Sequence, residues 1–294
     1  MGHRIVPHLW FDNQAADAAA FYADVFPESS VVDQVVLHDT PSGDVDVVWF
    51  EVWGQPFQAI SAGPLVSFNP SVSFTVTVDS PDQVDWLWGR LTEGGAALMP
   101  LDAYPWSERY GWVADRFGLS WQLMYRPDPP DQRITPSLLF TGDVSGRAEE
   151  AVTLYTSVFP DSKIEELVHW GPDEPPEVEG TVKQAVFTLD GYRMTAMDSA
   201  YPHGFGFNEA ISLVVMCDTQ EEIDRYWEAL SAVPEAEQCG WLKDRFGLSW
   251  QIVPGRMDEM LRSAGRETRD RLTRAFLPMK KIDLAELERV FAER

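Results

Sequence analysis

Residues 111–122 read GWVADRFGLSWQ, and residues 240–251 read GWLKDRFGLSWQ. Ten of these twelve positions are identical, at a separation of 129 residues along the chain. A match of this length does not arise by chance within one protein. It indicates that the chain contains two copies of one folding unit, joined in line.

The repeat predicts two domains and a tail that has no counterpart. We expect a first domain over residues 1–126 and a second over residues 134–254, each long enough to bury a core of its own. The linker at residues 126–133 is rich in proline. Residues 255–294 show amphipathic helical spacing, and we expect this tail to pack against one of the halves or against a second chain.

The pattern within the first half predicts a strand, a helix and three strands, and then the same series again. Apolar residues alternate over residues 5–11, as in a strand, and recur at helical spacing over residues 14–26. A second helix is expected over residues 81–91, where proline occupies the first turn. The other β-rich segments lie at residues 31–37, 45–53, 57–61, 72–78 and 119–125.

The composition excludes several classes of partner. The chain has 294 residues and a formal net charge of −24. A protein this acidic is a poor partner for nucleic acid or for an anionic membrane, because it cannot neutralise their phosphates. No apolar run reaches the ~20 residues of a membrane span. The two cysteines, Cys217 and Cys239, form no CxxC motif, and we expect a reducing, cytoplasmic location.

Five motifs resemble one known family and together cover nearly the whole chain. They are HLWFDNQAADAAAFYADVFPES at 8–29, GQPFQAISAGP at 54–64, FNEAISLVV at 207–215, GWLKDRFGLSWQIVP at 240–254 and LPMKKIDLAELE at 277–288. The chain resembles the PhnB-like family of the vicinal oxygen chelate superfamily, which includes glyoxalase I, extradiol dioxygenases and bleomycin resistance proteins. Members are often labelled 3-demethylubiquinone-9 3-methyltransferase. This sequence, however, has no strand followed by a Gly-rich turn that could hold a nucleoside cofactor.

The resemblance implies an α+β fold with two tandem vicinal oxygen chelate domains and a C-terminal helical tail. In that superfamily, two βαβββ modules form one curved, partly open sheet around a pocket, so we expect one such sheet in each half. Single-domain relatives pair as dimers whose modules meet across the interface. The two halves of this chain could play both partners, and we therefore expect a monomeric pseudo-dimer or a homodimer.

Metal-dependent members of the superfamily carry ligands on the first, fourth, fifth and eighth strands. The resemblance places these positions at His8, Glu51, Ser73 and Gln122 in the first half, and at Ser137, Thr188, Ser212 and Gln251 in the second. Serine and threonine hydroxyls are weak ligands for zinc or iron. We therefore expect no metal or other cofactor. A divalent metal held by His8, Glu51 and Gln122 in the first domain is the alternative.

The candidates for ligand binding are polar or aromatic side chains on the expected inner strands and one loop. They are His8, Trp10, Glu51, Gln58, Ser73, Trp106, Gln122, Thr195, Asp198, Ser212 and Gln251. Gln122 and Gln251 end the two copies of the repeated phrase, and an amide can orient a carbonyl or hydroxyl group of a ligand. The loop around Trp106 is expected either to form a lid over the first pocket or to pack as a surface loop.

The repeated phrase also has a purely structural interpretation. Asp115 next to Arg116, and Asp244 next to Arg245, are expected to hold a turn through a local ion pair and not to contact a ligand. The tryptophan of each copy is expected in the core.

Three functions remain open at this point. We expect a small-molecule binding protein without a catalytic metal. The first alternative is a divalent-metal-dependent lyase, isomerase or dioxygenase of the glyoxalase type that uses the first domain. The second is a protein-interaction module that acts through the acidic surface and the helical tail. The sequence does not identify the ligand.

Overall fold

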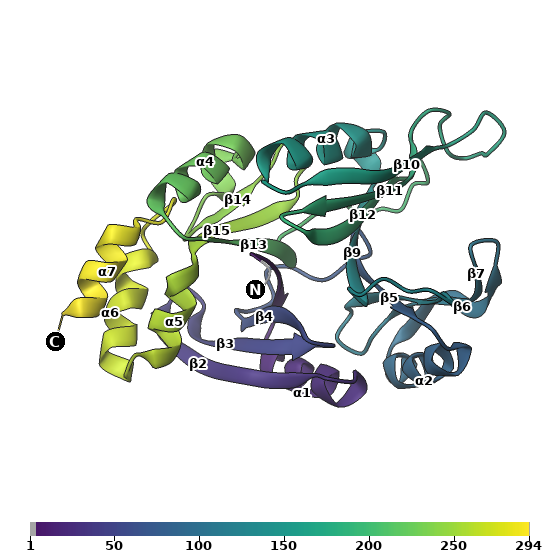
Figure 1. Cartoon of the computed structure of the whole chain (residues 1–294). Helices are drawn as coiled ribbons and strands as arrows, with labels where there is room; N and C mark the ends of the chain where they lie inside the picture. The colour runs from purple at the N-terminus through teal and green to yellow at the C-terminus, as the bar shows by residue number, and fades with distance from the viewer. Residues whose placement is uncertain (1–3, 294) are drawn as a thin grey trace.

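The computed structural model describes residues 4–293, and its elements fall into four similar modules and a tail (Figure 1). The first module contains β1 (Ile5–Phe11), α1 (Ala15–Val25), β2 (Ser30–Thr40), β3 (Gly43–Val52) and β4 (Gln55–Ser61). The second contains β5 (Val72–Val78), α2 (Pro81–Thr92), β6 (Ala96–Tyr104), β7 (Ser107–Ala114) and β8 (Ser120–Tyr125). Both modules follow the predicted order of a strand, a helix and three strands.

The second half repeats this series, with one strand fewer in its last module, and then adds three helices. The third module contains β9 (Ile134–Phe140), α3 (Ala148–Val158), β10 (Lys163–His169), β11 (Val182–Leu189) and β12 (Tyr192–Asp198). The fourth contains β13 (Ile211–Cys217), α4 (Gln220–Leu230), β14 (Trp241–Lys243) and β15 (Ser249–Pro254). The tail forms α5 (Gly255–Ser263), α6 (Arg266–Phe276) and α7 (Leu284–Ala292). Two single turns of 3-10 helix, η1 (Gly142–Val144) and η2 (Pro234–Ala236), lie in the connections before α3 and before β14.

Each sheet combines one module from each half of the chain. Sheet A has seven strands in the order β14-β15-β13-β1-β4-β3-β2, and sheet B has eight in the order β10-β11-β12-β9-β5-β8-β7-β6. The junctions are the antiparallel pairs of β1 with β13 and of β5 with β9. The predicted fold class is therefore present, as two open mixed sheets. The expectation that each half forms a sheet by itself is wrong, because the modules pair across the halves.

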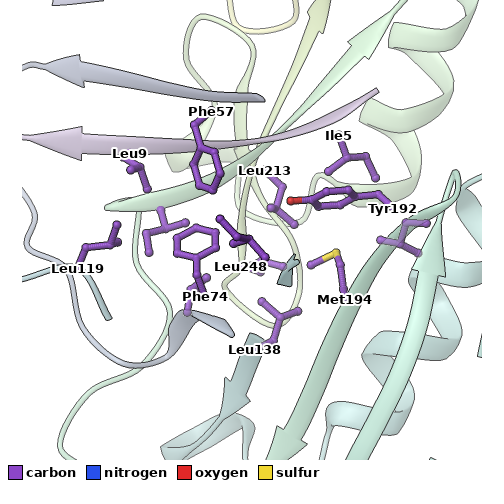
Figure 2. Packing of buried hydrophobic residues seen from close by; sticks show 14 of the residues in the cluster. Ile5, Leu9, Phe57, Phe74, Leu119, Leu138, Tyr192, Met194, Leu213 and Leu248 are labelled. Atoms are coloured by element: carbon purple, nitrogen blue, oxygen red, sulfur yellow. The ribbon is translucent and has the colours of Figure 1, made fainter. Parts of the chain in front are cut away.

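A single hydrophobic core lies between the two sheets. Figure 2 shows side chains of sheet A and sheet B in contact with one another at its centre. The rings of Phe57 on β4 and Phe74 on β5 are 5.2 Å apart between centroids. Leu138 on β9 and Leu213 on β13 belong to the same buried cluster. The two sheets therefore share one core, to which both halves of the chain contribute.

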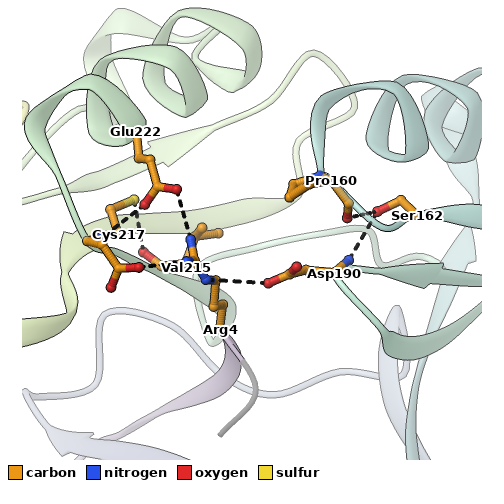
Figure 3. Close-up of polar contacts among 8 residues, drawn as sticks. Arg4, Pro160, Ser162, Asp190, Val215, Cys217 and Glu222 are labelled. Carbon is orange, nitrogen blue, oxygen red and sulfur yellow. Dashed lines mark hydrogen bonds and ion pairs between the residues drawn. The ribbon is translucent and has the colours of Figure 1, made fainter. Parts of the chain in front are cut away.

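Arg4 joins the two sheets at the surface as well (Figure 3). Its guanidinium lies 2.6 Å from Asp218 and 2.9 Å from Glu222, both next to β13 of sheet A. The same group lies 3.7 Å from Asp190, in the β11–β12 turn of sheet B. Each of these pairs is partly exposed, so each contributes little stability alone. Together they place the start of β1 between two modules of the second half.

The tail covers the face of sheet A that is turned away from the shared core. Leu272 and Phe276 on α6, with Leu287 on α7, belong to a second buried cluster. Sheet A contributes Val47 and Trp49 of β3 to the same cluster. The predicted tail helices are therefore present, and they pack within this chain (Figure 1). Within residues 4–293, no helix is long and apolar enough to cross a membrane.

Candidate functional site

Most of the candidate residues lie on the faces of the two sheets that are turned away from the shared core, which we call the inner faces. Side chains alternate between the two faces of a strand. Along β1, Ile5 and Leu9 point into the shared core, while Val6, His8 and Trp10 belong to the inner face of sheet A. The same alternation separates polar from apolar side chains on β5, β9 and their partners in sheet B.

On sheet A, the inner face brings together four candidates from both halves of the chain. His8 on β1 lies opposite Gln58 on β4 and opposite Ser212 on β13. Gln251 on β15 donates a hydrogen bond from Nε2 to Ser212 Oγ at 2.9 Å. Two residues of the first half therefore meet two of the second, which the exchanged pairing of the modules explains.

His8 is a buried, neutral imidazole. Its side chain is only 4% exposed and meets the ring of Trp241 edge-on, at 5.2 Å between centroids. Burial lowers the pKa of His8 to about 3, because the charged form would lose its hydration. Within the described residues, its Nδ1 atom has no hydrogen-bond partner. His8 therefore lies in the interior of the protein and not at its surface.

The tail closes over these groups. Gln58 donates a hydrogen bond from Nε2 to Asp258 Oδ2 on α5, at 2.6 Å. Trp10 donates from its indole nitrogen to the carbonyl oxygen of Gly63 at 2.9 Å and packs at the edge of the tail cluster. The inner face of sheet A is therefore occupied largely by the protein itself.

On sheet B, the equivalent positions form a row of neutral polar groups. Thr195 on β12 donates to Ser137 Oγ on β9 at 2.8 Å, and Ser137 also lies 2.7 Å from the Thr75 hydroxyl. Gln122 on β8 donates from Nε2 to Ser73 Oγ on β5 at 2.8 Å. Apart from Ser73, these side chains remain partly exposed. Hydroxyl and amide groups in this arrangement can hydrogen-bond a ligand without carrying charge.

An aromatic cluster adjoins this row at the β6–β7 hairpin. Tyr110 donates from its hydroxyl to Gln122 Oε1 at 2.8 Å, and burial raises its pKa, so the phenol stays protonated. Trp106 stacks on Tyr104 at 5.0 Å and meets Tyr110 edge-on at 5.5 Å. Trp106 is nevertheless 55% exposed. Trp106, in the loop expected to form either a lid or a packed surface loop, is thus linked to Gln122 through Tyr110.

Asp198 does not belong to either inner face. It lies on the opposite face of β12 and is almost completely buried. Its carboxylate accepts hydrogen bonds from the backbone nitrogens of Gly146 at 2.7 Å, Ala148 at 3.1 Å and Val182 at 2.9 Å. Asp198 therefore holds the start of α3, and its prediction as a ligand-binding residue is wrong. Ser61 has the corresponding place in the first half, where its hydroxyl accepts from Ala15 N at 3.1 Å.

The three side chains considered for a metal do not assemble. His8 and Glu51 belong to sheet A, whereas Gln122 belongs to sheet B. Glu51 lies on β3 opposite Pro56, where its side chain is exposed. Gln58, on β4, takes the place beside His8 that had been considered for Glu51.

The donor chemistry of neither inner face fits a resident zinc or iron ion. Sheet A itself offers one imidazole with amide and hydroxyl groups, beside which the tail places the Asp258 carboxylate. Sheet B offers hydroxyls and an amide. Both metals prefer imidazole, carboxylate or thiolate ligands. Among residues 4–293, no three His, Cys, Asp or Glu side chains are grouped so that they could hold a metal ion.

The repeated phrase has a structural role that differs from the expected ion pair. Asp115 is buried, and its carboxylate accepts hydrogen bonds from Tyr22 Oη at 2.8 Å and Trp121 Nε1 at 2.8 Å. It also accepts from the backbone nitrogens of Phe117 at 2.8 Å and Leu119 at 3.1 Å. Burial nevertheless raises the pKa of Asp115, with these donors acting against the rise.

The second copy repeats this arrangement. Asp244 accepts from Tyr155 Oη at 2.7 Å and from Trp250 Nε1 at 2.9 Å. The neighbouring arginines have other partners: Arg116 lies 3.5 Å from Glu93, and Arg245 lies 3.3 Å from Glu150. The predicted Asp–Arg pair within the phrase is therefore wrong, while the prediction of core tryptophans is confirmed.

Asp258 is the site residue that the sequence did not predict. It lies on the tail helix α5 beside Gln58, and burial raises its pKa to about 6 despite the opposing effects of Trp49, Arg262 and Gln58. The sequence feature that could have indicated Asp258 is an acidic residue between Met257 and Met260 on an amphipathic helix. The position of that helix could not be inferred from its own spacing.

Comparison with known proteins matches both halves of this chain to one protein family. The family described as 3-demethylubiquinone-9 3-methyltransferase matches residues 3–124 and, again, residues 132–253. The chain is similar to a putative 3-demethylubiquinone-9 3-methyltransferase, PhnB protein, from Bacillus cereus, with 30% identity over 42% of this chain and 100% of that one (TM-score 0.40). Comparison with curated proteins gives no match.

Two larger solved structures share the fold over most of the chain. Glyoxalase I from Zea mays has a TM-score of 0.55 and 11% identity, covering 89% of this chain and 98% of that one. A putative dioxygenase from Bacillus subtilis subsp. subtilis str. 168 has a TM-score of 0.54 and 15% identity, covering 97% and 99%. At these identities the likeness shows the glyoxalase-type fold alone.

Proposed function

This chain belongs to the family described as 3-demethylubiquinone-9 3-methyltransferase, the PhnB-like group with the glyoxalase-type fold, and we propose that it is a small-molecule binding protein. The ligand is held on the inner face of sheet B, without a catalytic metal. The observation that carries the proposal is the partly exposed polar row of Thr75, Gln122, Ser137 and Thr195, which the tail does not cover.

The side chains of this row support a neutral ligand with hydroxyl, carbonyl or amide groups. The second amide hydrogen of Gln122 and the hydroxyl of Thr195 can bond to a ligand. Trp106 offers an exposed aromatic surface for a flat ring. Because Tyr110 and Ser73 already hold the Gln122 amide from both sides, that amide is oriented before the ligand arrives.

The absence of a metal from this proposal rests on donor chemistry. Hydroxyl and amide groups are weak ligands that do not displace water from zinc or iron, whereas imidazole and carboxylate groups do. A glyoxalase-type metal enzyme is the second candidate, and it would use sheet A, where the unpaired Nδ1 of His8 favours it. Two features of that face oppose the metal enzyme: the tail covers it, and sheet A itself supplies a single strong donor, the imidazole of His8.

The proposal also addresses methyl transfer, protein partners and cellular location. Methyl transfer, which the family description names, is not part of it, because the sequence contains no strand and Gly-rich turn for a nucleoside cofactor. The tail is a poor protein-interaction surface, because its apolar face already packs against sheet A. We place the protein in the cytoplasm, which is compatible with the free thiols of Cys217 and Cys239.

We also propose that the chain acts as a monomeric pseudo-dimer with no nucleic-acid or membrane partner. The exchange of modules lets one chain build both sheets, which supports the monomer. Light scattering tests this point, and a mass of two chains at micromolar concentration contradicts it.

The binding proposal is tested by screening neutral single-ring fragments with hydroxyl or amide groups, using ligand-observed NMR on the full chain. Gln122→Leu should abolish binding of the hits, because it removes the oriented amide from sheet B. The repeat supplies a matched control: Gln251→Leu makes the same change on sheet A, under the tail, and should leave binding intact. Hits that respond equally to both variants, or a screen without hits, contradict the proposal.

A further inference from the structure

A small cavity remains where the tail helix α5 meets sheet A. Its volume is about 190 Å³, and it is lined on the polar side by Glu51, Gln58, Asp258 and Arg262. Val6 and Met216, together with the ring of Trp49, form its apolar side. A cavity of ~150 Å³ is enough to hold a benzene molecule. The space is therefore large enough for a ligand with a single ring.

The charges around this cavity are unbalanced. Among its lining residues, Asp258 on α5 and Glu51 on β3 are acidic, whereas the one cation is Arg262. Asp33 on β2, which pairs with Arg262, also lies near Arg269. Arg262 is committed elsewhere, because its Nε lies 2.8 Å from Asp33 Oδ2 and its guanidinium stands 5.8 Å from the Trp49 ring centroid. Within residues 4–293, Asp258 has no cation within ion-pair distance. Its carboxylate accepts a hydrogen bond from the neutral amide of Gln58.

The half-buried carboxylate of Asp258 has no ion-pair partner to compensate for its lost hydration. A neutral amide donor offsets only part of that cost, whereas a nearby positive charge offsets more of it. Asp258 lines the cavity. An anion in the cavity would be repelled by the carboxylates of Asp258 and Glu51. A purely apolar ligand would not offset the lost hydration of Asp258.

We propose that this cavity binds a small organic cation, with an ammonium group on a single ring or a short aliphatic body. The ammonium group donates to Asp258 and, at the open end, to Glu51. The apolar body packs on Met216 and Val6, beside the Trp49 ring. The site is separate from the polar row of sheet B, so neither proposal depends on the other.

The titration of Asp258 agrees with this geometry. Burial raises its pKa to about 6, so the free protein carries a carboxylate that is close to protonation at neutral pH. A bound ammonium group would favour the ionised form and lower that pKa. The groups that face Asp258 are Gln58 on β4, Trp49 and Glu51 on β3, and Arg262 on its own helix.

Benzylamine tests the proposal, because it is a single ring with one ammonium group. Isothermal titration calorimetry of the full chain at about pH 7.5 and physiological ionic strength should show binding. Benzyl alcohol, which has nearly the same shape without the charge, should bind about tenfold or more weakly. Asp258→Asn should weaken benzylamine binding by a similar factor while keeping a side chain that can bond to Gln58.

Glu259→Gln is the matched control, since it removes one negative charge from the neighbouring, exposed position on the same helix. It should leave the affinity unchanged, which separates the site from general attraction to an acidic protein. If Asp258→Asn fails to fold, the wild-type chain still decides the matter. Its affinity for benzylamine should fall about tenfold from about pH 7.5 to about pH 5, as Asp258 is protonated.

Several results would overturn the proposal. These are no binding of benzylamine, equal binding of benzyl alcohol, equal affinity in wild type and Asp258→Asn, or an affinity that does not change with pH. Loss of binding in Glu259→Gln would also overturn it, because the interaction would then reflect overall charge.

Discussion

The hydroxyl of Tyr22, on α1, donates a hydrogen bond to the buried carboxylate of Asp115 at 2.8 Å, in the turn between β7 and β8. Helix α1 packs on sheet A, whereas the β7–β8 turn belongs to sheet B. Tyr155 and Asp244 make the same bond at 2.7 Å in the opposite direction, from a helix on sheet B to a turn of sheet A. The repeated phrase therefore joins the two sheets, twice.

Tyr22→Phe should lower the free energy of unfolding by about 1–3 kcal/mol, because Asp115 then keeps its burial but loses one of its donors. Urea denaturation followed by tryptophan fluorescence measures the change. Tyr155→Phe is a matched variant, and its cost should be similar, because Asp244 has the same set of partners. An effect below about 0.5 kcal/mol in both variants would contradict the role assigned to these bonds.

The pH dependence of stability should contain a contribution from Asp258. Its pKa is about 6 in the folded chain and 3.8 in the unfolded reference, so the folded state binds a proton more tightly. The contribution is therefore complete below about pH 4 and is lost as the pH rises through about 6. Its upper limit is about 3 kcal/mol.

Comparison of wild type with Asp258→Asn isolates this contribution from the other carboxylates. The asparagine variant should gain stability relative to wild type between about pH 4 and pH 7, and Glu259→Gln should not. Denaturation midpoints measured across this range provide the check. A constant difference between wild type and Asp258→Asn would show that Asp258 titrates normally.

The tail helices should be essential to the stability of sheet A. Leu272 is 2% exposed, in the cluster between α6 and sheet A, so Leu272→Ala should cost about 2–5 kcal/mol. Leu65→Ala is the control, because Leu65 is 75% exposed, and its effect should stay within about 0.5 kcal/mol. Thermal unfolding followed by circular dichroism distinguishes the two. A mild effect of Leu272→Ala would mean that the tail detaches easily.

Metal content should be well below stoichiometric in protein purified without chelators. Neither inner face has the donors for zinc or iron, so elemental analysis of the wild-type chain and of His8→Ala should give the same low value. One tightly bound transition-metal ion per wild-type chain, lost in His8→Ala, would favour the metal-enzyme alternative on sheet A. Unfolding curves of His8→Ala provide the control for its folding.

Local sequence pattern was sufficient for most elements of this fold. Alternation over β1 and helical spacing over α1 reproduce the observed bounds within a few residues. The repeat also identified Gln122 and Gln251 as equivalent, and both lie on inner faces with a serine as partner. These features depend on residues close together in the chain, where periodicity and turn chemistry act directly.

The candidate site was less accessible to the same reasoning. Glu51 and Asp198 were plausible side chains on the expected strands, yet one is exposed at the end of β3 and the other holds the start of α3. A strand pattern identifies which residues share a face. It does not say which neighbouring strand or helix that face meets, and one residue of register separates a pocket side chain from a core side chain.

The sequence by itself determined that the chain carries two copies of one unit, which elements each copy forms, and that few strong metal ligands stand at the positions that the resemblance assigns to them. Only the tertiary structure decided that β1 pairs with β13 and β5 with β9, and that the tail covers sheet A while sheet B stays uncovered. The reason is that both copies present strand edges and apolar faces of the same kind. The choice among such partners is made by long-range packing, which local periodicity does not encode.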